Sequence, residues 1–235
     1  MDSAARISIE LRALASTELA ILQQRFFKTG FGQYGEGDVF MGIKVPPLRA
    51  LAKQHRDADL ATIATLLHSK FHEERLFALL LLMQFYECAT EKERGTAFDL
   101  YLDNTAHINN WDLVDVSSPH IVGRHLVNSS RKVLHRMAKS TSLWERRIAI
   151  ISTLYFIRDN DFDDTLRIAE TLLHDEHDLM HKAVGWMLRE VGKRDIETEE
   201  AFLLQHYHTM PRTMLRYAIE RFPEKRRQQY LKGTA

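Results

Sequence analysis

The stretch Arg75-Leu76-Phe77-Ala78 decides the fold, because weaker copies of it recur along the chain. Each copy places a cation shortly before a small or branched residue: Arg147-Ile148-Ala149, Lys182-Ala183-Val184 and Arg216-Tyr217-Ala218. One register then runs through five positions that lie 34 to 36 residues apart: Ala78, Val114, Ala149, Val184 and Ala218. A period of this length, built from two helices, predicts an α-solenoid whose helix pairs bury their apolar faces against their neighbours.

Apolar residues around these markers recur three and four positions apart, which is typical of amphipathic helices. Residues 6–29 are predicted to form one long helix, which the glycines of 30–37 end. Pro46 and Pro47 suit the first turn of the next helix. The remaining predicted helices cover 58–68, 73–87, 91–104, 109–126, 129–139, 142–158, 162–173, 177–192, 197–207, 212–221 and 224–231. No segment shows the alternation of a convincing strand.

The expected fold is therefore all-α, with HEAT-like helix pairs stacked into an α-solenoid as a single domain over residues 1–235. Tetratricopeptide repeats have a similar period, but their Trp-Leu-Gly-Tyr pattern is absent from the sequence. Equivalent positions of successive repeats line up on one surface of a solenoid. The stack is therefore expected to present a concave groove.

The composition excludes several classes of protein. Among the 235 residues, Lys plus Arg and Asp plus Glu both number 32, so the net charge gives no support to nucleic-acid binding. Cys88 is the only cysteine, which excludes a disulfide framework and favours a reducing compartment. No signal peptide is recognisable, and the most apolar run, 76–85, is too short to span a bilayer. We therefore expect a soluble cytoplasmic protein.

Charge is nevertheless segregated along the chain. The positions two before the register markers carry a cation in three of the last four repeats, and are occupied by Asp112, Arg147, Lys182 and Arg216. Residues 128–158 contain seven Lys and Arg against one acid, Glu145. A basic row along a concave groove would suit a phosphate backbone. The alternative is an ordinary solvated face.

An aromatic residue and a carboxylate stand together in the stretch Asn109-Asn110-Trp111-Asp112-Leu113-Val114-Asp115. On a helix, Trp111 and Asp115 share one face, whereas Asp112 points aside. Such a pair can hold a sugar or a cation beside a negative charge. The alternative is that Trp111 belongs to the core and that Asp115 caps a helix or pairs with an Arg. The other tryptophans, Trp144 and Trp186, fall in the next two repeats.

Other constellations point to no site. Histidines recur at helical spacing in two places, but no cysteine or His-Glu-x-x-His pattern accompanies them, so no metal site is predicted. These histidines are His68, His72, His174, His177 and His181. No Gly-x-Ser-x-Gly elbow is present, and Cys88 has no obvious base nearby, which argues against a Ser or Cys nucleophile.

The chain resembles the bacterial DNA alkylation-repair glycosylases of the AlkD type, which have a HEAT-like fold. The resemblance covers about residues 20–230 and rests on five motifs taken together. They are Phe40-x-Gly42-Ile43-Lys44-Val45-Pro46-x-Leu48-Arg49, Trp111-Asp112-x-Val114-Asp115, Trp144-x-x-Arg147-x-Ala149-Ile150, Lys182-Ala183-Val184-Gly185-Trp186-x-Leu188-Arg189-Glu190, and Thr209-Met210-Pro211-Arg212 through Ala218-Ile219. This family excises alkylated bases, notably N7-alkylguanine and N3-alkyladenine, from duplex DNA and captures the lesion while it remains stacked.

The resemblance implies a role for each matching residue. Asp115 would be the catalytic carboxylate, Trp111 and Trp186 an aromatic clamp, and Arg147 the cation of the site. An alkylated purine of this kind already carries a positive charge and leaves without a general acid. A fixed carboxylate can then stabilise the oxocarbenium-like sugar. Arg147 can hold a phosphate or position Asp115.

The residues expected to contact DNA are Arg146, Lys182, Arg189, Arg212, Arg216, Phe26 and Phe27. The last two are a departure, because glycosylases of this family carry a Tyr on an N-terminal helix, and these phenylalanines are the nearest candidates. We expect a monomer that repairs alkylated double-stranded DNA by base excision, with no cofactor, metal or membrane partner. The alternatives are a non-catalytic protein that binds distorted or branched DNA, and a protein-interaction solenoid.

Overall fold

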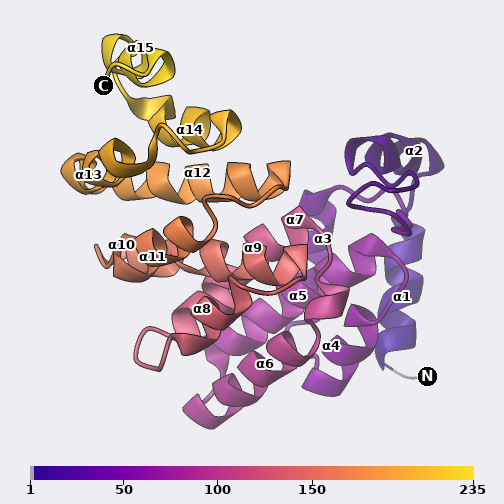
Figure 1. Ribbon diagram of the computed structural model, residues 1–235. Helices are drawn as coiled ribbons and strands as arrows, with labels where there is room; N and C mark the ends of the chain where they lie inside the picture. The colour runs from indigo at the N-terminus through magenta and orange to yellow at the C-terminus, as the bar shows by residue number, and fades with distance from the viewer. Residues whose placement is uncertain (1–2) are drawn as a thin grey trace. The chain divides into compact units, whose positions relative to one another are not determined.

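The computed structural model describes residues 3–235, and most of these residues lie in helices (Figure 1). The α-helices are α1 (Ser3–Ala13), α2 (Thr17–Phe26), α3 (Val45–Gln54), α4 (Leu60–Leu67), α5 (His72–Cys88), α6 (Glu91–Asp103), α7 (Trp111–Ser118), α8 (Lys132–Met137), α9 (Leu143–Ser152), α10 (Leu154–Arg158), α11 (Asp163–Thr171), α12 (Asp178–Gly192), α13 (Ile196–His206), α14 (Arg212–Ala218) and α15 (Glu224–Lys232). Single turns of other helix types are η1 (Thr105–His107), η2 (Pro119–Gly123) and η3 (Ile219–Arg221). Over residues 3–235 the strand-like pairing is limited to one isolated bridge between Val39 and Phe71, so the all-α prediction is confirmed.

The chain divides into two compact units, and the division falls inside α7, after Leu113. In the first unit, α5 packs against α3, α4 and α6, and α1 packs against α4. In the second unit, α12 is the central helix, because α9, α13 and α14 all pack against it. None of the helices described over residues 3–235 is both long and apolar enough to cross a membrane.

The helical repeat is confirmed by burial. The five register residues lie on α5, α7, α9, α12 and α14 and are all fully buried: Ala78, Val114, Ala149, Val184 and Ala218. A small residue is needed where two of these helices approach most closely. At Gly185 a Cβ would overlap the Met214 carbonyl oxygen, so the glycine of α12 allows α14 to pack directly against it.

The predicted long helix over 6–29 is wrong, because two helices occupy this segment. α1 ends at Ala13 and α2 begins at Thr17. Ser16 separates them as the N-cap of α2, since its extended backbone leaves the helix and its Oγ accepts a hydrogen bond from the Leu19 N–H, at 3.4 Å. α1 buries Ala4, Ile7 and Leu11, whereas none of the residues of α2 is buried.

The other predicted helices are present, several of them as shorter pieces. The segment 109–126 contains α7 and the π-helical turn η2, and 142–158 breaks into α9 and α10. At that break the Thr153 hydroxyl donates back to the Ile150 carbonyl at 2.7 Å. Pro46 and Pro47 occupy the first turn of α3, as predicted.

Candidate active site

Asp115 and Arg147 form a two-pronged ion pair within the second unit. The Asp115 carboxylate on α7 accepts from Nε of Arg147 on α9 and from its Nη2, each at 2.8 Å. Nη1 of the same guanidinium donates to the Leu179 carbonyl at 2.6 Å. The parallel bonds fix the orientation of the carboxylate as well as its position. The Asp115 side chain keeps 17% of its surface exposed, so a ligand can still reach it.

Arg147 is buried, with 4% of its surface exposed. The expectation that it lies in an exposed row of cations facing phosphates is therefore wrong, because its guanidinium is enclosed by Asp115 and the start of α12. Of the two roles that the sequence allows for Arg147, the geometry favours the positioning of Asp115.

Trp186 lies on α12 in the second unit and is half-buried. Its indole N–H donates to Oε1 of Glu190 at 2.9 Å, and Nζ of Lys193 binds the same oxygen at 2.6 Å. Glu190 therefore holds the edge of the indole. The aromatic face of Trp186 is the part of the ring that remains for stacking.

Trp111 begins α7, four residues before Asp115, and it belongs to an aromatic cluster of the first unit. Its ring stacks on Phe27 at 5.3 Å, and Phe27 stacks in turn on Phe40 at 4.9 Å. Phe26 meets Trp111 edge to face at 6.0 Å. The cluster fixes the ring of Trp111 through the end of α2 and the loop before α3.

The two phenylalanines thus differ in what they can do. Phe27 is 8% exposed and lies in the core of the cluster. The prediction that it contacts DNA is therefore wrong, because DNA cannot reach its buried ring. Phe26 ends α2 with 65% of its surface exposed. Phe26 is therefore the one of the pair that remains available to a ligand.

A buried polar network lies beneath the aromatic cluster. Its ionisable members are Asp38, His72 and Arg75, each at most 6% exposed. His72 on α5 binds Asp38 through Nδ1 at 3.1 Å and Asp112 through Nε2 at 2.8 Å. Arg75 donates to the second oxygen of Asp38 at 2.5 Å. Asp112 is therefore bonded to His72, a histidine whose ring contacts the aromatic cluster around Trp111.

The loop that supplies Asp38 and Phe40 is held by a buried carboxylate. Glu73 accepts hydrogen bonds from three consecutive backbone N–H groups, those of Met41, Gly42 and Ile43, at 2.8 to 3.1 Å. Gly42 has a φ of +81°, and a Cβ there would overlap the Ser16 carbonyl oxygen. The motif around Gly42 therefore exists because this loop must turn tightly against α2 and over Glu73.

The predicted DNA-contacting cations are less free than the sequence suggests. Arg146 binds Asp175 at 2.6 Å, Lys182 binds Asp178 at 2.7 Å, and Arg189 binds Glu220. Arg212 is exposed and donates to the Leu231 carbonyl, and Arg216 is exposed. Within the second unit, Lys182, Arg212 and Arg216 are the members of this set that present the most accessible charge.

Tertiary ion pairs also reduce the excess of positive charge in residues 128–158. Arg131 binds Asp161 and Asp164, Arg146 binds Asp175, and Arg147 binds Asp115, so each of these cations meets an acid outside the segment. The four other cations of the segment are exposed: Lys132, Arg136, Lys139 and Arg158.

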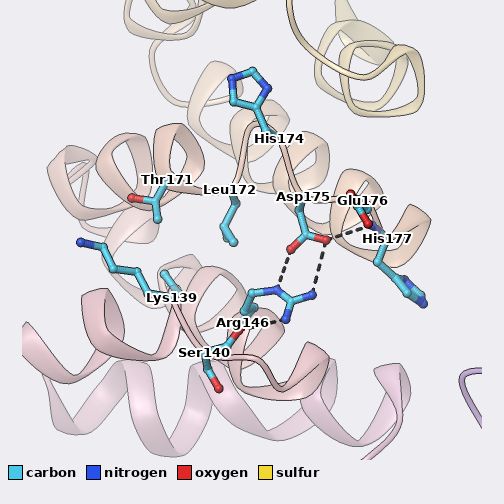
Figure 2. A pocket seen from close by; sticks show the side chains of 10 residues that line it. Lys139, Ser140, Arg146, Thr171, Leu172, His174, Asp175, Glu176 and His177 are labelled. Atoms are coloured by element: carbon cyan, nitrogen blue, oxygen red, sulfur yellow. Dashed lines mark hydrogen bonds and ion pairs between the residues drawn. The ribbon is translucent and has the colours of Figure 1, made fainter.

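An open hollow of about 620 Å³ lies where the turn between α8 and α9 meets the turn between α11 and α12. Figure 2 shows Asp175 directed at the Arg146 guanidinium on its floor, with Lys139 at the rim. Burial lowers the pKa of His177, and its Nδ1 accepts from the Leu179 N–H as the N-cap of α12. Within residues 3–235, no three His, Cys, Asp or Glu side chains cluster as metal ligands would.

Sequence reasoning missed the network around His72. The spacing of His72 relative to His68 suggests only a metal ligand, and no such site is predicted. A usable signal was the run of polar residues His72-Glu73-Glu74-Arg75 at the start of an otherwise apolar helix, since buried charges require partners elsewhere in the chain.

Comparison with known proteins places this geometry in context. Residues 7–222 match the sequence profile of the family described as DNA alkylation repair enzyme. Among solved structures, the chain is similar to the "Predicted DNA alkylation repair enzyme from Enterococcus faecalis", with a TM-score of 0.69 and 17% sequence identity, over 89% of this chain and 97% of that chain. At that identity the structural likeness supports the fold alone. The comparison with curated proteins gives no match.

Proposed function

The chain belongs to the family of DNA alkylation repair enzymes, and we propose that it is a DNA glycosylase that excises cationic alkylated purines from duplex DNA. N7-alkylguanine and N3-alkyladenine are the proposed substrates. Their positive charge makes them good leaving groups, so the enzyme has to stabilise the sugar rather than protonate the base. We propose that the lesion is attacked without being flipped out of the duplex, by a cytoplasmic enzyme that acts as a monomer and without a cofactor.

The observation that carries this proposal is the Asp115–Arg147 pair. A carboxylate that is held by two parallel bonds, and is still 17% exposed, can stabilise developing positive charge without first reorganising. As the glycosidic bond stretches, the deoxyribose gains oxocarbenium character, and the Asp115 charge stabilises it. The same carboxylate can orient or deprotonate the attacking water.

The remaining site residues have supporting roles in this proposal. Trp111 and Trp186 supply aromatic faces for the cationic sugar, because a positive charge is attracted to the face of an indole ring. Lys182, Arg212 and Arg216 contact phosphates, and the exposed Phe26 contacts the duplex in place of a tyrosine. Arg146 and Arg189 would have to exchange their present acidic partners for phosphate, so their contribution to DNA affinity is smaller.

The test is excision from a duplex that contains a single N7-methylguanine, followed by alkaline cleavage of the abasic strand. Asp115→Asn keeps the size of the side chain and removes its charge. It should lower the excision rate by roughly a hundredfold or more, with duplex affinity nearly unchanged. Excision by this variant at the wild-type rate would remove Asp115 from the mechanism.

The matched control is Asp164→Asn. Asp164 also pairs with an arginine, Arg131, at 2.9 Å and with His135 at 2.6 Å, so the substitution breaks a comparable bridge of the second unit. It should leave excision within about threefold of wild type. Asp112→Asn is not a neutral control, because Asp112 binds His72.

A second candidate function is favoured by one observation. Phe26, the exposed aromatic at the end of α2, has no hydroxyl group. A protein of this fold that binds distorted or branched DNA without excision would show salt-dependent duplex binding and no alkali-labile cleavage in the wild type. That result would return Asp115 to a structural role.

A further inference from the structure

Trp111 is held from both sides by one pair of buried groups. The residue before it, Asn110, donates to Asp38 at 3.0 Å and accepts from the Trp111 N–H at 2.8 Å. The residue after it, Asp112, binds His72 at 2.8 Å. Asp38 and His72 are themselves bonded, so the start of α7 is attached to a closed circuit of side chains.

The geometry of this circuit sets the charge on His72. Each ring nitrogen faces a carboxylate oxygen, and an ionised carboxylate can only accept. A neutral imidazole has one N–H and would turn a lone pair toward one of the two carboxylates. Both contacts are satisfied together only by the imidazolium, which donates from Nδ1 and Nε2.

The surroundings maintain that charge. The ionised groups that face His72 are Asp38 and Asp112, with Arg75 reaching it through Asp38. The neighbouring Glu73 is turned to the backbone of residues 41–43. Burial opposes the charge, but Asp112 and Asp38 outweigh it and raise the pKa of His72 to about 9.

The imidazole also supports the aromatic cluster. Its ring stacks on Phe40 at 4.4 Å and lies 5.1 Å from Phe27. Phe27 is the ring on which Trp111 stacks. His72 therefore reaches Trp111 by two routes, through the backbone at Asn110 and Asp112 and through the ring stack.

We infer that His72 is a positioning residue, whose imidazolium orients Trp111 for its ligand. The importance of Trp111 in excision rests on the function proposed above, whereas the effect of His72 on Trp111 does not. Asp112 contributes to the same positioning of Trp111, because its carboxylate binds the His72 imidazolium. Loss of the proton from His72 would leave Asp38 and Asp112 both ionised around a single N–H donor and release the start of α7.

The first experiment measures Trp111 without DNA. In a chain with Trp144→Phe and Trp186→Phe, Trp111 is the only tryptophan, and acrylamide quenching of its fluorescence reports its accessibility. Quenching should rise about twofold between pH 8 and pH 10, with a midpoint set by the pKa of about 9 for His72. His72→Gln, which removes the charge, should show the higher quenching at every pH.

His55→Gln is the matched control. His55 is also a buried histidine of the first unit and binds Glu10 at 2.7 Å, but it has no contact with the aromatic cluster over the described residues. This variant should retain the wild-type transition. Identical quenching in His72→Gln and in its parent at pH 8 would overturn the inference, as would a parent with no transition near pH 9.

A second measurement needs no substitution and therefore survives a variant that does not fold. The ¹⁵N signals of the His72 ring in the unaltered protein should show both nitrogens protonated at pH 7 and a titration near the pKa of about 9. A ring that is neutral at pH 7 would overturn the inference.

The excision assay separates this inference from the proposed function. His72→Gln should lower the single-turnover excision rate by about tenfold while changing duplex affinity less. If the wild type excises nothing but the quenching results hold, the proposed function fails and the positioning of Trp111 stands. If excision by His72→Gln is normal although Trp111 is released, the orientation of Trp111 is irrelevant to the reaction and the inference for ligand binding fails.

Discussion

Two glutamates, one in each unit, are equally buried but differ in their hydrogen bonding. Glu73 of the first unit is 1% exposed and receives hydrogen bonds from three backbone N–H groups. Glu199 of the second unit is also 1% exposed, but its Oε1 has no hydrogen-bond partner among the described residues. Burial, with help from the neighbouring Glu200, raises the pKa of Glu199 to about 8.

The difference lies in the hydrogen-bond donors that surround each buried carboxyl group. Glu73 replaces its lost water with donors, and so it can anchor the loop that carries Asp38 and Phe40. Among the described residues, no donor reaches Oε1 of Glu199, and burial favours the neutral acid. Asp115 lies between these cases, because it is fully engaged by Arg147 and still open to a ligand.

Gly42→Ala should have the largest effect, because it distorts the loop that Glu73 anchors. The positive φ disfavours a side chain, and the new Cβ would overlap backbone atoms of α2. Urea unfolding should show a loss of stability of about 3 kcal/mol. Gly32→Ala is the control, since Gly32 also has a positive φ but no neighbouring atoms within 4 Å. Equal losses in the two variants would mean that the close packing of the loop contributes nothing.

Arg147→Lys tests the two-pronged pairing in the second unit. A lysine keeps the charge but cannot form parallel bonds to Asp115, so the carboxylate loses its fixed orientation. Single-turnover excision should fall roughly tenfold to a hundredfold. Arg131→Lys alters another inter-helix bridge of the same unit and should reduce stability without reducing excision. A wild-type rate in Arg147→Lys would show that charge alone suffices.

Glu73→Gln removes the charge that the three N–H groups of residues 41–43 share. Stability should fall by about 2 kcal/mol, because hydrogen bonds to an ionised acceptor are replaced by weaker ones and an amide N–H is buried. Glu74→Gln is the comparison, since Glu74 is also buried but, among the described residues, is bonded to Ser69 alone. A larger loss from Glu74→Gln would contradict the anchoring role of Glu73.

Glu199→Gln should have the smallest effect and the opposite sign. The folded protein holds a proton on Glu199 up to a pKa of about 8, whereas the unfolded chain releases it near the ordinary value of 4.5. Stability of the wild type therefore declines as pH rises from 4.5 to 8, and the glutamine variant lacks this decline. Thermal unfolding at pH 8 should show a gain of about 1 kcal/mol, which disappears near pH 5. A variant that is less stable at both pH values would disprove the neutral-acid interpretation.

Local sequence patterns predict most of the helices and their repeat. The register residues are buried wherever the 34 to 36 residue spacing placed them, because apolar periodicity along a helix is set by the residues themselves. The break between α1 and α2 was missed, although Ser16 has the side chain of an N-cap, because the apolar pattern continues on both sides of it.

The sequence pattern does not show which charged side chains are exposed and which are paired. Arg146 and Arg147 look like members of a basic surface when only their neighbours in sequence are counted, yet their partners are Asp175 and Asp115, about thirty residues away. Nothing in the sequence near Asp112 indicates a partner, yet in the structure it binds His72 of α5. An ion pair depends on distances between side chains of different helices, and a single helix does not contain that information.

The sequence by itself therefore determined that this chain folds into repeated helix pairs, and it identified Trp111, Asp115 and Arg147 as residues worth following. Their roles were decided by the tertiary structure. It enclosed Arg147 and left Asp115 open, it buried Phe27 and exposed Phe26, and it placed His72 between Asp38 and Asp112. The physical reason is that burial and hydrogen-bond satisfaction are properties of the packed chain, whereas periodicity belongs to each helix alone.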